Sequence, residues 1–136
     1  MGLFSRKTKI VDNSEASLET KFFGWLDGVL GKKLPSGIEA IAFNLYEDAD
    51  NNWSIELVGS SYFSETDPDW PCSEVYTTRE NPFSIKRELD WGEIEKTFTD
   101  LVNLYLEKGQ YSDDLKQYQA IGIGFVDGDT TIIYKK

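Results

Sequence analysis

The chain has 136 residues, with 24 acidic and 14 basic side chains, so its formal net charge is −10. This length fits one domain, and an aromatic content of 14% excludes a disordered chain, because disordered segments are poor in aromatic residues. A surface this acidic repels phosphate backbones and anionic membranes, which excludes nucleic acid and membrane surfaces as partners. We therefore expect a basic protein as the partner. The alternative is that the charge serves solubility alone.

A single cysteine, Cys72, rules out an internal disulfide, and we expect its thiol to be buried. The first residues show no signal peptide, and no apolar run approaches the roughly 20 residues of a membrane span. These features predict a cytoplasmic protein.

The first half of the chain predicts one helix and three strands after a basic tail. Residues 1–11 are expected to form this flexible tail, and residues 12–136 a single domain. Apolar residues recur at three- and four-residue intervals from Leu18, which predicts a helix over about 14–30. Asp, Ala and Asn residues at 48–52 predict the turn of a hairpin. Alternating, β-branched and aromatic residues predict strands at 40–45, 53–58 and 74–78.

The second half predicts a long helix. Asp90 and Glu93 have capping-box spacing, which marks a helix start. Apolar residues from Trp91 to Tyr105 share one face of this helix, which is expected to end at Gly109.

The remaining segments complete the predicted order α-β-β-β-α-β-β. Residues 83–89 are ambiguous, and a short helical turn is expected between 112 and 119. Strands at 121–126 and 131–134 flank Asp127-Gly128-Asp129, which predicts a tight hairpin turn. Short turns imply antiparallel neighbours, so we expect an α+β fold with a five-stranded antiparallel sheet and the helices packed on one face.

The sequence offers no residues arranged for catalysis, a cofactor or a metal ion. It contains no histidine, which removes the commonest general base and metal ligand, and one cysteine cannot form a zinc site. Asp48, Asp50 and Asn52 match the start of a calcium loop. However, Trp53 and Gly59 occupy positions where that loop needs Gly and Glu.

Two further features are interpreted as structural. Gly122-Ile-Gly124 lies inside a predicted strand, so it does not match a nucleotide-binding loop. It indicates either the close approach of a helix or backbone segment or a β-bulge. Arg79 and Glu80 are expected to form a surface ion pair without a chemical role.

The best candidate for a binding site is the polar loop before the third strand. It combines carboxylates with a tryptophan that no apolar stripe explains, as in an interface with an aromatic anchor and a charged rim. A solvated acidic loop and a carboxylate-based glycoside hydrolase are the alternatives. The other tryptophans are expected in the core (Trp25, Trp91) or half buried (Trp53). The predicted partner-binding residues are Glu65, Asp67, Asp69, Trp70, Glu74 and Tyr76.

The segment from Phe43 to Thr78 contains the strand Phe-Asn-Leu-Tyr-Glu-Asp, then Asn-Asn-Trp-Ser-Ile-Glu-Leu-Val-Gly-Ser, the acidic loop Asp-Pro-Asp-Trp-Pro-Cys, and Glu-Val-Tyr. It resembles the small cytosolic immunity proteins that bacteria encode beside polymorphic or contact-dependent toxins. This resemblance implies a non-enzymatic inhibitor that covers a toxin domain, and many such toxins are nucleases with basic clefts. An acidic cover suits fast, electrostatically steered capture. A housekeeping adaptor or an oligomeric structural domain is the alternative, and the sequence assigns no oligomeric state.

Overall fold

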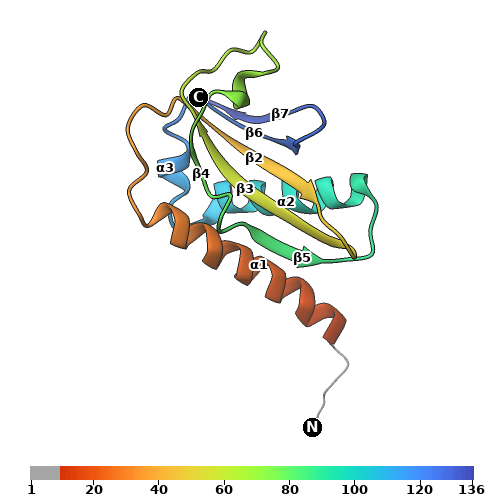
Figure 1. Ribbon diagram of the computed structural model, residues 1–136. Helices are drawn as coiled ribbons and strands as arrows, with labels where there is room; N and C mark the ends of the chain where they lie inside the picture. Colours follow the sequence, from red (N-terminus) through yellow and green to blue (C-terminus); the bar gives the residue numbers. More distant parts are fainter. Residues whose placement is uncertain (1–9) are drawn as a thin grey trace.

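The structure, a computed structural model, describes residues 10–136, with side chains from residue 17 onward. Most of the predicted basic tail lies outside the described residues, but Ile10 and Val11 already belong to the first helix, which begins earlier than expected. The elements in chain order (Figure 1) are α1 (Ile10–Leu30), β2 (Ala40–Glu47), β3 (Asn52–Ser60), η1 (Trp70–Cys72), β4 (Glu74–Thr77), β5 (Phe83–Lys86), α2 (Trp91–Lys108), α3 (Ser112–Leu115), β6 (Ala120–Phe125) and β7 (Thr131–Lys135).

The strands form one mixed sheet in the order β4-β3-β2-β6-β7, and β5 pairs with β3 on the same edge as β4. The predicted α+β class is confirmed. The predicted five-stranded antiparallel sheet is wrong in two respects: β2 and β6 run parallel, and the ambiguous segment 83–89 supplies a sixth strand, β5. Short turns fix the antiparallel pairing only within each hairpin. Because α2 lies between the two hairpins, the chain can return beside β2 in the same direction.

Two local signals, at the β2–β3 turn and at the start of α2, are confirmed. The tight turn expected at 127–129 is wrong, because β6 and β7 are joined by the longer segment 126–130, in which no residue has a positive φ. In the β2–β3 turn, Asp50 and Asn51 adopt left-handed backbone conformations, with φ of 60° and 61°, which Asp and Asn tolerate better than most residues. At the start of α2 the Asp90 carboxylate accepts a hydrogen bond from the Glu93 amide, and the Glu93 carboxylate accepts one from the Asp90 amide. This reciprocal capping satisfies two amides that have no partner within the helix.

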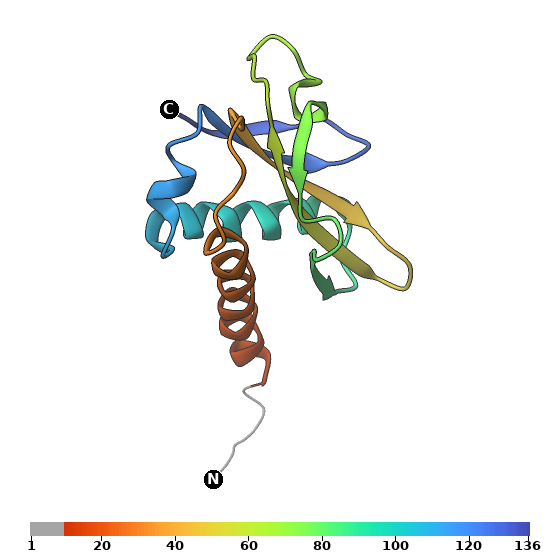
Figure 2. The same cartoon turned by 60° about the vertical axis from the view of Figure 1, so that its left-hand side comes forward.

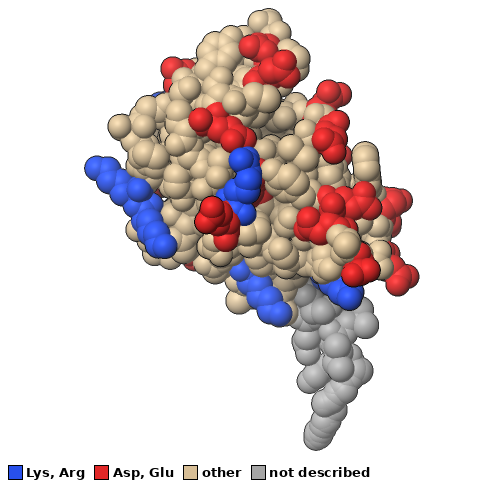
Figure 3. Space-filling view, in the orientation of Figure 1, with Lys and Arg blue, Asp and Glu red and all other residues tan. Residues whose placement is uncertain are grey.

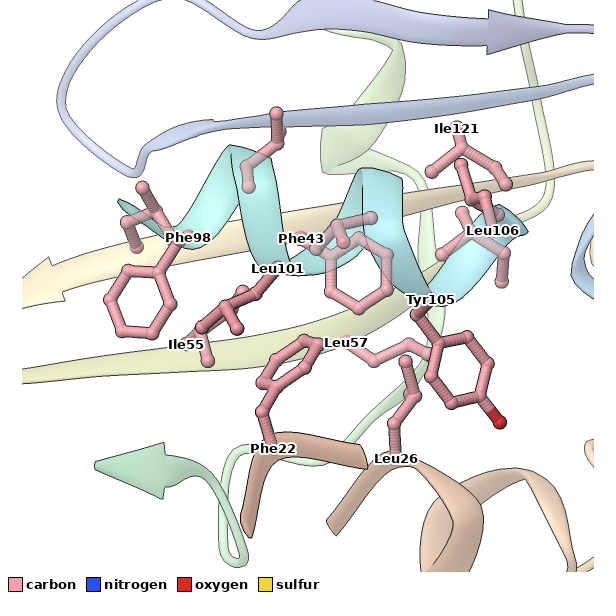
Figure 4. Packing of buried hydrophobic residues seen from close by; sticks show 14 of the residues in the cluster. Phe22, Leu26, Phe43, Ile55, Leu57, Phe98, Leu101, Tyr105, Leu106 and Ile121 are labelled. Atoms are coloured by element: carbon pink, nitrogen blue, oxygen red, sulfur yellow. The ribbon is translucent and has the colours of Figure 1, made fainter. Parts of the chain in front are cut away.

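One face of the sheet packs against all three helices and forms the main core, as predicted. Figure 4 shows Phe22 and Leu26 of α1 and Phe98 of α2 pointing toward Phe43 and Leu57 of the sheet. Seen from another side, α1 and α2 run in different directions under this face (Figure 2). The strand alternation predicted from the sequence therefore identified the side chains of β2 and β3 that enter the main core. It did not predict that most of the intervening positions are buried as well.

The opposite face carries no helix and is called the helix-free face below. One half of it is covered by the loop 61–73, which contains η1. The Trp70 ring lies on small residues there, and a Cβ atom added to Gly122 would lie 2.9 Å from its Cζ2 atom. Phe63 packs edge-on against the ring, with 5.2 Å between centroids. The expected close approach of a segment to Gly122 is thus confirmed. The residues buried in this second cluster are Ala40, Ala42, Val58, Trp70 and Ala120.

A hydrogen bond within the main core joins α1 to α2. The hydroxyl of Tyr105, whose side chain is buried, donates to Asp27 Oδ1 at 2.6 Å and accepts from the Tyr111 amide at 3.2 Å. Burial, and then the hydrogen bond to Asp27, raise the pKa of Tyr105 above its ordinary value. The neutral phenol is therefore favoured in the folded protein.

We expect Tyr105→Phe to lower the free energy of unfolding by about 1–3 kcal/mol near neutral pH, because it removes a hydrogen bond to a charged group. Unfolded tyrosine ionises near pH ~10, whereas folded Tyr105 resists ionisation, so its contribution to stability is complete below that pH and declines as the pH rises further. The variant should therefore lose less stability than the wild type between about pH 9 and pH 11. Urea unfolding across this range measures both effects. An equal loss of stability in the wild type and in Tyr105→Phe across this pH range would contradict this account.

Candidate functional site

The open half of the helix-free face carries a cluster of polar side chains around a completely buried carboxylate. Glu56, in the middle of β3, has no exposed surface. Its Oε1 accepts a hydrogen bond from Arg79 Nε at 3.0 Å, and its Oε2 accepts from Arg79 Nη2 at 3.0 Å and Asn44 Nδ2 at 3.2 Å. The Tyr46 hydroxyl also donates to Oε2. This polar cluster consists of Asn44, Tyr46, Glu56, Glu74 and Arg79.

Arg79 supplies the positive charge of the polar cluster. Its side chain is half exposed, and Nη2 donates a further hydrogen bond to Glu74 Oε2 at 2.8 Å. The bonds to Glu74 and Glu56 raise the already high pKa of the guanidinium. Burial, followed by the hydrogen bond to Glu56, raises the pKa of Tyr46. The predicted Arg79–Glu80 pair is wrong, because the guanidinium turns back over β3 to a carboxylate that solvent does not reach.

A shallow cleft of about 280 Å³ adjoins the polar cluster. Ser54 Oγ donates to Asp48 Oδ2 at 2.9 Å on its floor, so these side chains are held in position. Both oxygens of Glu56 already accept hydrogen bonds, and use of this carboxylate as a general base would require breaking its ion pair. The site therefore presents a fixed polar surface for contact. The lining residues are Tyr46, Asp48, Ser54, Glu56, Arg79, Pro82 and Ser84.

The predicted acidic loop lies over the other half of the helix-free face, and its carboxylates differ in their contacts. Glu65 forms an ion pair with Lys135 Nζ at 2.6 Å, and both side chains are about half exposed. Asp67 Oδ1 accepts a hydrogen bond from the Asp69 amide at 2.9 Å, which stabilises the turn before η1. Asp69 is exposed, and its carboxylate takes part in none of the hydrogen bonds or ion pairs found among residues 17–136.

The prediction that Trp70 is an accessible anchor is wrong. Only 2% of this residue is exposed, because its ring covers the small residues of β2 and β6. Its carbonyl accepts a hydrogen bond from Ser60 Oγ at 2.7 Å, which joins η1 to the end of β3. Trp70 therefore closes one half of the helix-free face and is not available to a partner.

Glu74 and Tyr76, the other predicted binding residues, lie on opposite faces of the sheet. A β-bulge between Gly59 and Ser60 pairs Glu74 with Ser60 but Tyr76 with Gly59, and these two neighbours of β3 point to opposite sides. Glu74 joins the polar cluster, whereas Tyr76 packs against the main core. The structure thus separates the two residues that the alternation of an unbroken strand would place together.

Four further predictions about exposure are corrected. Trp91, expected in the core, is 55% exposed at the first position of α2, where it lies beside the ends of β2 and β6. Trp53 is nearly fully buried, and Trp25 is only partly buried, with its indole nitrogen donating to the Asn81 carbonyl at 2.8 Å. Cys72 is exposed because the short η1 turn buries Trp70 and Pro71 but directs the next residue outward.

Glu56 was not predicted as a site residue, because an acidic residue that alternates with apolar residues along a strand is expected to face solvent. Two signals point to it. Asn44 and Glu56 are cross-strand partners in the β2–β3 register. Arg79 is also the only basic residue between Lys33 and Lys86, so it is the only local counter-charge for a carboxylate buried in this segment.

Comparison of the chain with protein-family models, curated proteins and solved structures gave no match. Within residues 10–136, no helix is both long enough and apolar enough to cross a bilayer. The described part of the chain also contains no group of three or more Asp, Glu or Cys side chains placed to hold a metal ion.

We expect Arg79→Met to lower the free energy of unfolding by about 2–4 kcal/mol, because it leaves the buried Glu56 carboxylate without its counter-charge while solvent offsets part of the loss at the half-exposed arginine. The double variant Arg79→Met/Glu56→Met should recover most of this loss, because both charges are removed together. Urea unfolding of the single and double variants measures the coupling.

Lys96→Met is the matched control for the arginine substitution. It breaks the Lys96–Asp100 pair, in which both side chains are largely exposed, so its effect should stay below about 0.5 kcal/mol. Equal losses in Arg79→Met and Lys96→Met would show that burial of Glu56 has no energetic consequence.

Proposed function

We propose that this domain is a non-enzymatic, acidic protein-binding module that captures a basic protein partner. In its most specific form, the proposal is that the domain is an immunity protein that covers a toxin domain, as the resemblance of the segment 43–78 implies. The observation that carries the proposal is the open half of the helix-free face, where fixed polar side chains line a shallow cleft between two acidic regions.

The charge of this side of the molecule favours a basic partner. In Figure 1 the sheet lies in front of α2. In the same orientation, Figure 3 shows acidic side chains gathered over the β2–β3 turn and the start of α2, and again over the loop 61–73. Basic side chains stand singly or in small groups, and Arg79 is paired with two carboxylates. A field of one sign raises the association rate of an oppositely charged protein.

The polar cluster favours binding because its side chains are ordered before a partner arrives. The side chains of Asn44, Tyr46 and Glu56 form hydrogen bonds within the domain. An interface built from ordered side chains loses less conformational entropy on association than one built from mobile side chains. A fast electrostatic approach to an ordered surface suits an inhibitor that must capture its target before the target acts.

The carboxylates of the polar cluster favour this proposal over a carboxylate-based hydrolase. Such an enzyme needs one free carboxylate and one free carboxylic acid on either side of the scissile bond. Glu56 and Glu74 are both bound to the same guanidinium, so neither carboxylate is free to act on a substrate.

We expect the association rate with the natural basic partner to fall steeply as salt is raised from about 50 to about 300 mM, because the attraction between exposed charges is screened. The partner is first recovered on the immobilised wild-type chain from the native host and identified by mass spectrometry. Asp69→Lys, a reversal that breaks no hydrogen bond found within residues 17–136, should lower the rate about threefold or more at low salt.

Glu107→Lys is the matched control, since it makes the same change in net charge at an exposed position in the last turn of α2, behind the sheet in Figure 1. Its association rate should stay close to that of the wild type. A partner whose capture is insensitive to salt and to both reversals would favour the housekeeping adaptor or oligomeric structural domain, in which acidity serves solubility alone.

A further inference from the structure

Trp91 has the largest exposed fraction of the large hydrophobic residues described as exposed, at 55%. It is the first residue of α2, directly after the Asp90 cap. An isolated exposed apolar residue is ordinary on a protein surface. Trp91 differs because its position is fixed by contacts with two other elements of the fold.

The indole ring is held by a hydrogen bond at its nitrogen and by stacking on another aromatic ring. Its Nε1 donates a hydrogen bond to Glu47 Oε1, at the end of β2, at 2.8 Å. The ring stacks on Phe125 at the end of β6, with 5.3 Å between centroids and 24° between planes. Phe125 packs edge-on against the buried Trp53, which connects Trp91 to the main core. The exposed ring is therefore ordered without a partner, which reduces the entropy lost when one binds.

The surroundings of the ring are acidic. The segments 47–50 and 86–96, called the acidic end below, hold seven Asp or Glu residues and three Lys or Arg residues. One of the three, Lys96, is paired with Asp100. Figure 3 shows these acidic side chains gathered over the β2–β3 turn and the start of α2. Glu95 follows Trp91 by one helical turn and lies on the same side of α2.

We propose that Trp91, at the acidic end and on the helix-covered side of the sheet, is an anchor for a basic protein, and that it receives an arginine or lysine side chain of that protein. The cation lies over the indole ring, where the negative face of the aromatic system attracts it, and Glu47 and Glu95 supply counter-charge. Because the indole N–H is already bonded to Glu47, the partner needs no acceptor at this position. This inference rests on the proposed function and replaces Trp70 by Trp91 as the anchor.

The test uses a library of random dodecapeptides displayed on phage, selected on the immobilised wild-type chain at low salt. We expect enrichment of sequences that place Arg or Lys beside an apolar residue. Synthetic versions of these peptides should bind Trp91→Ala at least about tenfold more weakly than the wild type, as for truncation of an interface anchor. Glu47→Gln, which keeps an acceptor for the indole, should weaken binding about threefold and reduce its dependence on salt.

Tyr62→Ala is the matched control, because Tyr62 is also an exposed aromatic residue, at 44%, but lies in the loop after β3. Its affinity for the peptides should stay within about twofold of the wild type. Circular dichroism and urea unfolding establish that each variant is folded. Trp91→Phe retains an aromatic ring that can stack on Phe125 and attract a cation. The peptides should therefore bind Trp91→Phe more tightly than Trp91→Ala.

The outcomes separate the anchor from the general function. Basic peptides that bind Trp91→Ala as tightly as the wild type would overturn the anchor and leave the acidic binding module standing. Selection of sequences without Arg or Lys, or of none at all, would overturn both. Sedimentation that finds a wild-type dimer and a Trp91→Ala monomer would also overturn the anchor, because it would assign this surface to a second copy of the chain.

Discussion

The ion pair between Glu56 and Arg79 determines the arrangement of the helix-free face. A carboxylate removed from water costs several kcal/mol unless a counter-charge and hydrogen bonds compensate it. Glu56 lies in β3 inside the sheet, and the side chains of Tyr46 and Arg79 bond to its carboxylate, which has no exposed surface. Arg79, in the loop between β4 and β5, must therefore return over β3. The two short strands share one edge of β3, and the loop between them places Arg79 within reach of Glu56.

The two halves of the helix-free face are stabilised by different interactions, apolar packing on one half and polar hydrogen bonds on the other. On one half, Trp70 covers alanines and a glycine, so that burial of apolar area stabilises the loop 61–73. On the other half, hydrogen bonds hold polar side chains in a cleft that stays open. The covered half stabilises the domain, and the open half provides a surface with ordered polar groups. A partner that docks there meets side chains whose own hydrogen bonds are already satisfied.

Elements that depend on neighbouring residues in the chain were predictable from the sequence. The capping box at Asp90, the turn at 48–52 and the alternation in β2 and β3 follow from local rules, and each has the expected form. Features that depend on distant contacts were not predictable. The parallel pairing of β2 with β6 depends on where α2 returns the chain, and the bulge opposite β4 reverses which face Tyr76 occupies. The polar cluster depends on such contacts more than the fold class does.

The exchange of roles between Trp70 and Trp91 illustrates why polarity of the surrounding sequence is a poor guide to exposure. Trp70 lies in an acidic loop, yet that loop folds onto small residues of two strands that only the sheet brings together. Trp91 continues an apolar stripe, yet the first turn of α2 lies at the ends of β2 and β6, where the core covers one side of the ring only. A ring in that position has its polar atom bonded and much of its apolar surface in water. Burial of that surface by a partner would add hydrophobic free energy without breaking the hydrogen bond to Glu47, while the surrounding carboxylates select for a cation.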